Sequence, residues 1–232
     1  MSVSLGLTQE ELDSLRQFDS CMVANAVEKF KVRLRNTGFT DASIHCMFPD
    51  APPMVGYAAT ARLRSDEPPI SGKTFLDRTD FWNKILEIRA PRILVLEDMD
   101  DTPGRGAFIG DVHASILKAL GCIGYVTNGA ARELPSVRRM GVQVFAGNAA
   151  VSHAYAHIFD VGAAIRVGGM DVKPGDLLHG DQHGVLTVPL EIACEIPKVA
   201  IAMKSAEQKV IDFCKSSSFS IAKLQELMKT VV

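Results

Sequence analysis

The chain has 232 residues, of which 47% are hydrophobic and 22% charged, and this balance excludes a disordered protein. The formal net charge is −2 and no sustained basic stretch is visible, so nucleic acid is not expected as a partner. The start, MSVSLGLTQEELDSL, lacks the basic region and long apolar stretch of a secretory signal, and no other segment suggests a membrane partner. The five cysteines form no CxxC pair, which disfavours disulfides and zinc clusters and makes a reduced cytoplasm the expected location.

The first half of the chain predicts helices followed by alternating strands and helices. Thr8 and Glu11 have the spacing of a capping box, so a helix is expected near Thr8, and the chain continues helical to about Phe30. Alternating and buried-type patterns, together with one helical spacing of apolar residues, predict a strand at Met54–Arg64, a helix at Thr74–Arg89 and a strand at Arg92–Asp98.

The second half repeats this rhythm and then changes. A helix that begins at Asp111 and is closed by Gly121, a buried strand from Cys122, a short helix ended by Gly141 and a strand follow in order, which predicts a parallel sheet with right-handed crossovers. Glycine-rich turns over residues 164–188 predict antiparallel hairpins. We therefore expect one α/β domain over residues 1–188. Residues 189–232 are expected to form a helical C-terminal extension, packed on the domain or on a neighbouring subunit.

Polar residues follow two successive strand regions of this predicted sheet. Asp111 opens a helix, and Arg132 and Glu133 lie just past the next strand. If these strands are parallel neighbours, the three residues meet outside the carboxyl ends of the sheet, where α/β proteins bind ligands. The backbone N–H groups of Asp111, Val112 and His113 are expected to be unpaired at the helix start and to face an anion or a developing oxyanion.

These residue types suit a 2-oxo acid. Arg132 can hold a carboxylate in bidentate fashion. Glu133 and Asp111 supply oxygen ligands for a hard divalent cation such as Mg²⁺. Together they predict a site that binds the carboxylate and ketone oxygens of the substrate and stabilises an enolate.

The spacing resembles that of a known family. Twenty residues separate Asp111 from Arg132, and an acid follows at once. This resembles the D-X20-R-D motif of the RraA-like family, which includes class II 4-hydroxy-4-methyl-2-oxoglutarate/4-carboxy-4-hydroxy-2-oxoadipate aldolases. The segments GCIGYVTNGAARE, GVQVFAG, VKPGD and HGVLTVP are similar too, and the resemblance covers Asp19 to Pro189. It implies a swivelling β/β/α three-layer fold and a homotrimer or homohexamer with sites at subunit interfaces.

Carried over by position, the resemblance makes Gly110–His113 the substrate loop and Arg132 the residue that binds the 2-oxo acid. Glu133 would hold Mg²⁺ or Mn²⁺, with Asp111 contributing directly or through water. The family usually has Asp at the position of Glu133, and often Asp-Gly where this chain has Asn128-Gly129. Glu is one methylene longer, so the metal must shift or be bound through water.

The implied activity is that of a metal-dependent carbon–carbon lyase. It would cleave 4-hydroxy-2-oxo acids by a retro-aldol reaction that releases pyruvate, or decarboxylate oxaloacetate, or both. The base that takes the 4-hydroxyl proton is either a water near Asp111 or Asp111 itself. The alternative within the same family is a non-catalytic regulator that binds and inhibits a ribonuclease, a role that would not need the metal acid.

Other polar groups have simpler interpretations beside functional ones. His113 either lines the substrate pocket or caps its helix. Asp181 and His183 are interpreted as turn residues, and the acids of Glu97–Asp101 as a solvated turn rather than a second metal site. A G-x-G-x-x-x-G pattern ending at Gly110 is a weak match to a nucleotide loop, because Asp111 would face the phosphates with a like charge.

Overall fold

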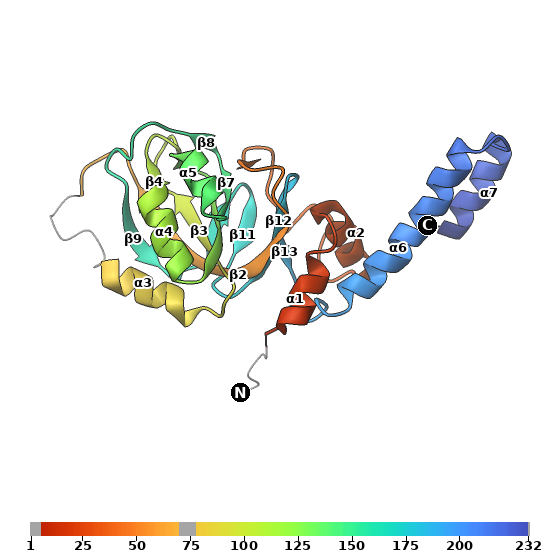
Figure 1. Ribbon diagram of the computed structural model, residues 1–232, viewed down its shortest axis with the longest axis horizontal. Coiled ribbons are helices and arrows are strands. Elements are labelled where there is room, and N and C mark those ends of the chain that lie inside the picture. Colours follow the sequence, from red (N-terminus) through yellow and green to blue (C-terminus); the bar gives the residue numbers. More distant parts are fainter. Residues whose placement is uncertain (1–5, 70–77, 232) are drawn as a thin grey trace.

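The computed structural model describes residues 6–69 and 78–231, and its centre is one large sheet (Figure 1). Four parallel strands form the middle of this sheet in the order β7-β5-β3-β2, with β1, β9, β12 and β13 added antiparallel. The strands are β1 His45–Cys46, β2 Met54–Arg64, β3 Arg92–Asp98, β5 Cys122–Thr127, β7 Gln143–Ala146, β9 His157–Val161, β12 Leu177–Asp181 and β13 Gly184–Val188. The parallel centre confirms the α/β prediction.

Two smaller sheets accompany the large one. Three short parallel strands pair in the order β4-β6-β8, with bounds Ala107–Ile109, Ala130–Ala131 and Asn148–Ala149. The hairpin of β10 Ile165–Val167 and β11 Met170–Val172 turns through Gly168 and Gly169, both at positive φ. It packs on the face of the large sheet that carries Ile93, Val95 and Phe145. Together with the β12–β13 pair, it confirms the antiparallel hairpins predicted for residues 164–188.

Seven helices are described, and they fall into three groups (Figure 1). One group, α3 Arg78–Glu87, α4 Asp111–Ala119 and α5 Leu134–Arg139, packs on the other face of the sheet. A second group, α1 Gln9–Leu15 and α2 Ser20–Phe30, shares a core with β12, β13 and the start of α6. The third, α6 Ile196–Lys215 and α7 Ile221–Val231, projects from the body as a helical pair. None of the described helices has the length and apolarity needed to cross a bilayer.

Local sequence explains most of these elements. Thr8 and Glu11 form the predicted capping box, and Gly121 and Gly141 take the left-handed conformation just past their helices. The strands β2 and β3 have the predicted bounds. Of the helix expected at Thr74–Arg89, the part over residues 74–77 lies outside the described residues, and α3 covers 78–87.

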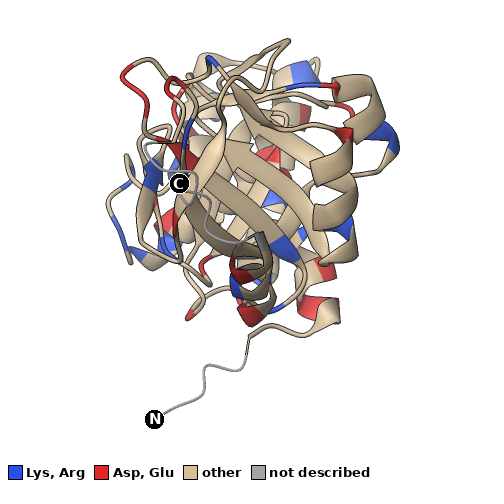
Figure 2. Ribbon diagram, turned by 90° about the vertical axis from the view of Figure 1, so that its left-hand side faces the viewer, with Lys and Arg blue, Asp and Glu red and all other residues tan. Residues whose placement is uncertain are grey.

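The helical run expected from Thr8 to Phe30 is wrong in one respect, because it consists of two helices. Asp19 begins the second one, and its side chain accepts the backbone N–H of Met22 at 2.7 Å. The cysteines are all free, as predicted, and Cys122 is buried. On the side of the molecule shown in Figure 2, acidic and basic segments are interspersed rather than gathered into one basic face.

The interpretation of Glu97–Asp101 as a solvated turn is wrong for Asp98, although Asp101 is exposed. The Asp98 side chain is buried and accepts the backbone N–H groups of Gly104 at 2.8 Å and Asp100 at 3.1 Å. Burial raises the pKa of Asp98 to about 6 despite these hydrogen bonds. Asp100 in turn accepts the N–H and hydroxyl groups of Ser65. The hydrogen bonds of Asp98 and Asp100 hold the loop that leads into β4. A run of acidic residues in the sequence does not reveal this structural role.

Candidate functional site

The predicted site residues leave the same edge of a parallel sheet, although it is not the sheet that was expected. In the small sheet Ala107 pairs with Ala130, and Ile109 with Ala131. The chain passes from Ile109 into Gly110 and α4, and from Ala131 into Arg132. The twenty-residue spacing therefore spans α4, β5 and the turn into β6, and it returns the chain to the carboxyl end of the neighbouring short strand.

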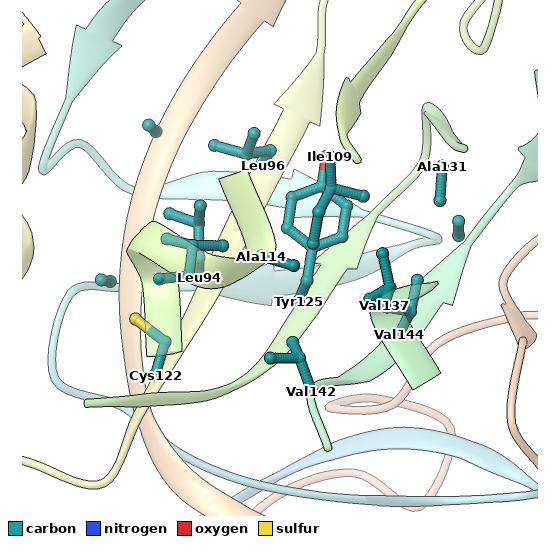
Figure 3. Packing of buried hydrophobic residues seen from close by; sticks show 14 of the residues in the cluster. Leu94, Leu96, Ile109, Ala114, Cys122, Tyr125, Ala131, Val137, Val142 and Val144 are labelled. Atoms are coloured by element: carbon teal, nitrogen blue, oxygen red, sulfur yellow. The ribbon is translucent and has the colours of Figure 1, made fainter. Parts of the chain in front are cut away.

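The ends of these short strands are fixed by the core beneath them (Figure 3). Ile109 and Ala131 are fully buried, and they share a cluster with Ala114 of α4, Tyr125 of β5 and Val137 of α5. Gly110 and Arg132 thus each follow an anchored apolar residue. Such anchoring holds the polar groups in place without using their own side chains for folding.

Glu133 joins the two strand ends. Its Oε2 accepts the backbone N–H of Asp111 at 2.9 Å, and its Oε1 lies 2.6 Å from Nη2 of Arg132. Glu133 has φ of +54°, a left-handed conformation that turns its side chain back toward the start of α4. A Cβ on Gly110 would come within 2.5 Å of Glu133 Oε2, so glycine leaves room for this contact. The expectation that the Asp111 N–H is unpaired is therefore wrong.

The electrostatics favour an ionised carboxylate at this position. The N–H of Asp111 and then the guanidinium of Arg132 lower the pKa of Glu133, and the Asp111 side chain also interacts with it. Two adjacent carboxyl groups offer the oxygen ligands that Mg²⁺ and Mn²⁺ prefer. No third His, Cys, Asp or Glu joins them within the described residues, so water would complete the coordination, as Mg²⁺ usually requires.

A cavity of about 470 Å³ opens beside these residues, a size typical of small-molecule sites. Its described lining comprises Pro69, Phe81, Trp82, Ala107, Phe108, Gly110, Asp111, Val112, His113, Arg132, Glu133 and residues 153–158. All six predicted site residues thus border one cavity. His113 stacks on Phe108 with ring centroids 4.5 Å apart, which favours the pocket-lining interpretation over a helix cap.

The sequence did not predict that residues 153–158 form a wall of the same cavity. Residues 153–158 are held by hydrogen bonds on both sides, from Ala107 N–H to the Ser152 carbonyl and from Tyr155 N–H to the Ser65 carbonyl. The wall contributes His153 and His157 to the cavity. Its only local mark in the sequence is the alternation of His, Tyr and His with alanine over residues 153–157.

The Asp181–His183 pair lies elsewhere and is structural, as predicted. Asp181 Oδ1 accepts the His183 N–H at 2.9 Å, and Oδ2 accepts the Ser20 N–H at 2.8 Å. The Ser20 hydroxyl lies 3.0 Å from Nδ1 of His179, whose Nε2 lies 3.1 Å from the Phe18 carbonyl. We call Ser20, His179 and Asp181 the buried cluster; it fastens the start of α2 to β12.

Comparisons with known proteins identify the family and the fold of the chain. A protein of Halalkalibacterium halodurans, provisionally named a 4-hydroxy-4-methyl-2-oxoglutarate aldolase, is 31% identical over 84 residues, which are 36% of this chain. The match spans only 40% of that relative's length. An uncharacterized protein from Pseudomonas syringae pv. tomato str. DC3000 has a similar structure, with a TM-score of 0.74, 21% identity and coverage of 99% of both chains.

Streptomyces coelicolor RraAS2, described as an unusual member of the RNase ES inhibitor RraA protein family, is also similar. Its TM-score is 0.68 at 21% identity, over 88% of this chain and 96% of that one. At identities this low, structural similarity establishes the fold alone. It confirms the predicted three-layer architecture. The model of the RraA-like family, described as Aldolase/RraA, matches residues 20–187, and the chain therefore belongs to the RraA-like family.

Proposed function

We propose that the protein is a lyase, dependent on Mg²⁺ or Mn²⁺, that cleaves 4-hydroxy-2-oxo acids and releases pyruvate. Decarboxylation of oxaloacetate would use the same enolate chemistry. The observation that carries the proposal is that Arg132, Glu133 and the start of α4 border one cavity. The name of the Halalkalibacterium relative supports the same reaction class.

In this proposal Arg132 binds and orients the substrate. Its guanidinium, with a side chain 28% exposed, borders the cavity and can donate to the carboxylate of a 2-oxo acid. The positive end of the α4 dipole lies at the same place and favours negative charge. Both interactions strengthen as the C3–C4 bond breaks and charge builds on the departing pyruvate enolate, so they accelerate the reaction.

Glu133 and Asp111 would hold the cation. Their oxygen atoms fit a hard divalent ion, and the lowered pKa of Glu133 keeps its carboxylate available as a ligand. The chemistry that a bound cation supplies is stabilisation of negative charge on the enolate oxygen. The base for the 4-hydroxyl proton is Asp111 or a water that it holds, as the sequence already indicated.

The cavity favours the lyase over the ribonuclease regulator. A regulator acts through its outer surface, and it does not need an internal space of about 470 Å³ beside a paired arginine and glutamate. The lyase requires such a space, because the reacting acid must be surrounded and oriented.

A substrate panel tests the proposal. Pyruvate release would be followed for a set of 4-hydroxy-2-oxo acids and oxaloacetate, with Mg²⁺ or Mn²⁺ and again with excess EDTA. We expect turnover of at least one acid, its loss in EDTA and its recovery on adding metal. Undiminished pyruvate release in EDTA would remove the metal from the mechanism, and no release from any acid would leave the regulator as the better assignment.

We also propose a homotrimer or homohexamer. The exposed apolar residues Ile201, Ile211, Phe219 and Ile221 on or beside α6 and α7 are consistent with contacts between subunits. Multi-angle light scattering at micromolar concentration should give three or six times the mass of 25.1 kDa, and a stable monomer would contradict the assembly.

A further inference from the structure

The cavity lining has two chemically different parts. The charged part consists of Asp111, Arg132 and Glu133, which are joined by the contacts of Glu133. Much of the remaining described lining is apolar or aromatic, and it includes Phe81, Trp82, Phe108, Val112 and Ile158. Apart from Arg132, no Lys or Arg is among the described lining residues.

The aromatic residues of the apolar part of the lining pack against one another rather than lying scattered around the cavity. Phe81 is buried and meets Phe108 edge to face, with ring centroids 6.0 Å apart, and Phe108 contacts His113 in turn. Trp82 is partly buried beside them on α3. Such aromatic groups gain free energy by contact with apolar groups, and they offer no compensation to a desolvated carboxylate.

The two histidines of residues 153–158 are held by hydrogen bonds to nearby backbone carbonyl groups. Nδ1 of His153 lies 2.7 Å from the Ala154 carbonyl, and Nδ1 of His157 lies 2.7 Å from the Tyr155 carbonyl. A carbonyl oxygen only accepts, so each Nδ1 carries the proton of its hydrogen bond. These hydrogen bonds hold both imidazole rings against the backbone of their own segment.

From this polarity we infer that the substrate is a 4-hydroxy-2-oxo acid whose C4 substituent is uncharged and apolar, of aryl or branched-alkyl type. The inference rests on the proposed function and names its substrate class. The oxo-acid end would lie against Arg132, and the C4 substituent against Phe81, Trp82 and Phe108. Substrates with a second carboxylate at C4 would place that charge against an apolar wall.

The reaction is balanced without a further co-reactant. The C3–C4 bond breaks and its electron pair becomes the enolate of pyruvate. The 4-hydroxyl group loses its proton, and C4 departs as an aldehyde. The enolate then takes a proton at C3 to give pyruvate.

The test compares 4-hydroxy-2-oxo-4-phenylbutanoate, which yields benzaldehyde, with 4-hydroxy-2-oxoglutarate, which yields glyoxylate. Both release pyruvate, so one assay with Mg²⁺ serves both. We expect kcat/KM for the phenyl substrate to be higher by about tenfold or more, in line with discrimination by apolar pockets. Equal or better turnover of the dicarboxylate would overturn this inference and leave the proposed function standing. Release of pyruvate from neither acid, nor from the wider panel, would overturn both.

A positive charge introduced into the apolar part of the cavity lining tests the inferred preference for an apolar substituent. Trp82→Arg should reduce or reverse the preference for the phenyl substrate, mainly through KM. Leu86→Arg is the matched control, because Leu86 is exposed on the same helix and does not line the cavity. Should Trp82→Arg not fold, Trp82→Ala should raise KM for the phenyl substrate alone. An unchanged ratio of the two kcat/KM values in the folded Trp82 variant would contradict the assignment.

Discussion

Two clusters of polar residues in this molecule each contain a hydrogen-bonded carboxylate, and they differ in their access to the cavity. The buried cluster contains a serine, a histidine and an aspartate within hydrogen-bond distance, as many catalytic sites do. Burial lowers the pKa of His179, and both of its ring nitrogens have partners, the Ser20 hydroxyl and the Phe18 carbonyl. None of its members lines the cavity at Arg132.

The site at Arg132 differs from the buried cluster in exposure as well as in residue type. Glu133 and Arg132 pair with side chains 37% and 28% exposed, and they border a cavity. Their hydrogen bonds hold them in position without enclosing them. Residue types alone therefore do not identify a site, and access to a cavity distinguishes the candidate site from the cluster that fastens the fold. This difference predicts which substitutions affect activity and which affect stability.

The largest effect on activity is expected for Arg132→Ala. We expect kcat/KM to fall about a hundredfold or more, near 3 kcal/mol, because one charge-stabilising donor is lost from the transition state. The melting temperature should change little, since Arg132 follows a strand end that is anchored by Ala131. Arg132→Lys should restore activity only partly, because a point charge does not replace the planar guanidinium. Wild-type turnover by Arg132→Ala would exclude this role.

An effect on stability alone is expected for Asp98, the buried carboxylate beneath the small sheet. Its pKa is raised from 3.8 to about 6, so the folded state binds a proton more tightly than the unfolded state. The stability that this protonation confers is present at low pH and is lost as pH rises from about 4 to 6, by about 3 kcal/mol in all.

Urea unfolding of the wild type and Asp98→Asn between pH 4 and pH 7 checks this linkage. The free energy of unfolding of the wild type should fall relative to that of the variant as pH rises. A difference that stays constant over this range would show that Asp98 is not a buried acid of raised pKa.

Breaking the buried cluster should lower stability and spare catalysis. Asp181→Ala leaves the buried N–H of Ser20 without its acceptor, at a cost of about 2 kcal/mol, or roughly 4–8 °C in Tm. Asp181→Asn keeps an acceptor oxygen and should cost less. Differential scanning calorimetry gives Tm, and kcat/KM at 25 °C should match the wild type. A loss of activity without a loss of Tm would place this cluster in the catalytic site.

The smallest effect is expected for Gly110→Ala. The backbone at Gly110 has φ −140° and ψ −165°, which alanine also adopts, so the fold should tolerate the change. The added Cβ would displace Glu133 Oε2 from the Asp111 N–H, and we expect roughly a tenfold drop in kcat/KM. Adding Glu133→Asp shortens the acid and should recover part of this loss. Full activity of Gly110→Ala would show that the contact is dispensable.

The sequence predicted those parts of the fold that have long periodic patterns. The strands Met54–Arg64 and Arg92–Asp98 and the helix at Asp111 were visible because apolar residues repeat over several turns or strand positions. The short strands β4, β6 and β8 have two or three residues each, too few for any period. The site was therefore expected at the edge of the large sheet, although the small sheet positions it.

The proximity of the candidate site residues was predictable, and their mutual contacts were not. The spacing of Asp111 and Arg132 brings them together because the segments that carry them leave neighbouring parallel strand ends. The bond from Asp111 N–H to Glu133 depends on the left-handed backbone of Glu133, which a non-glycine residue rarely adopts. The position of residues 153–158 depends on the hydrogen bond from the Ala107 N–H to the Ser152 carbonyl. Such long-range contacts leave little signal in the local sequence.

The central claim is that Arg132 binds the 2-oxo acid and its enolate, and a binding measurement tests it most directly. Oxalate has the planar pair of carboxyl oxygens that mimics the pyruvate enolate, so it would be titrated calorimetrically into the wild type, Arg132→Ala and Asp181→Ala with Mg²⁺ present. We expect the wild type and Asp181→Ala to bind oxalate with equal affinity, and Arg132→Ala to bind it at least tenfold more weakly, a loss of about 1.4 kcal/mol or more. Equal affinity in all three proteins would contradict the claim.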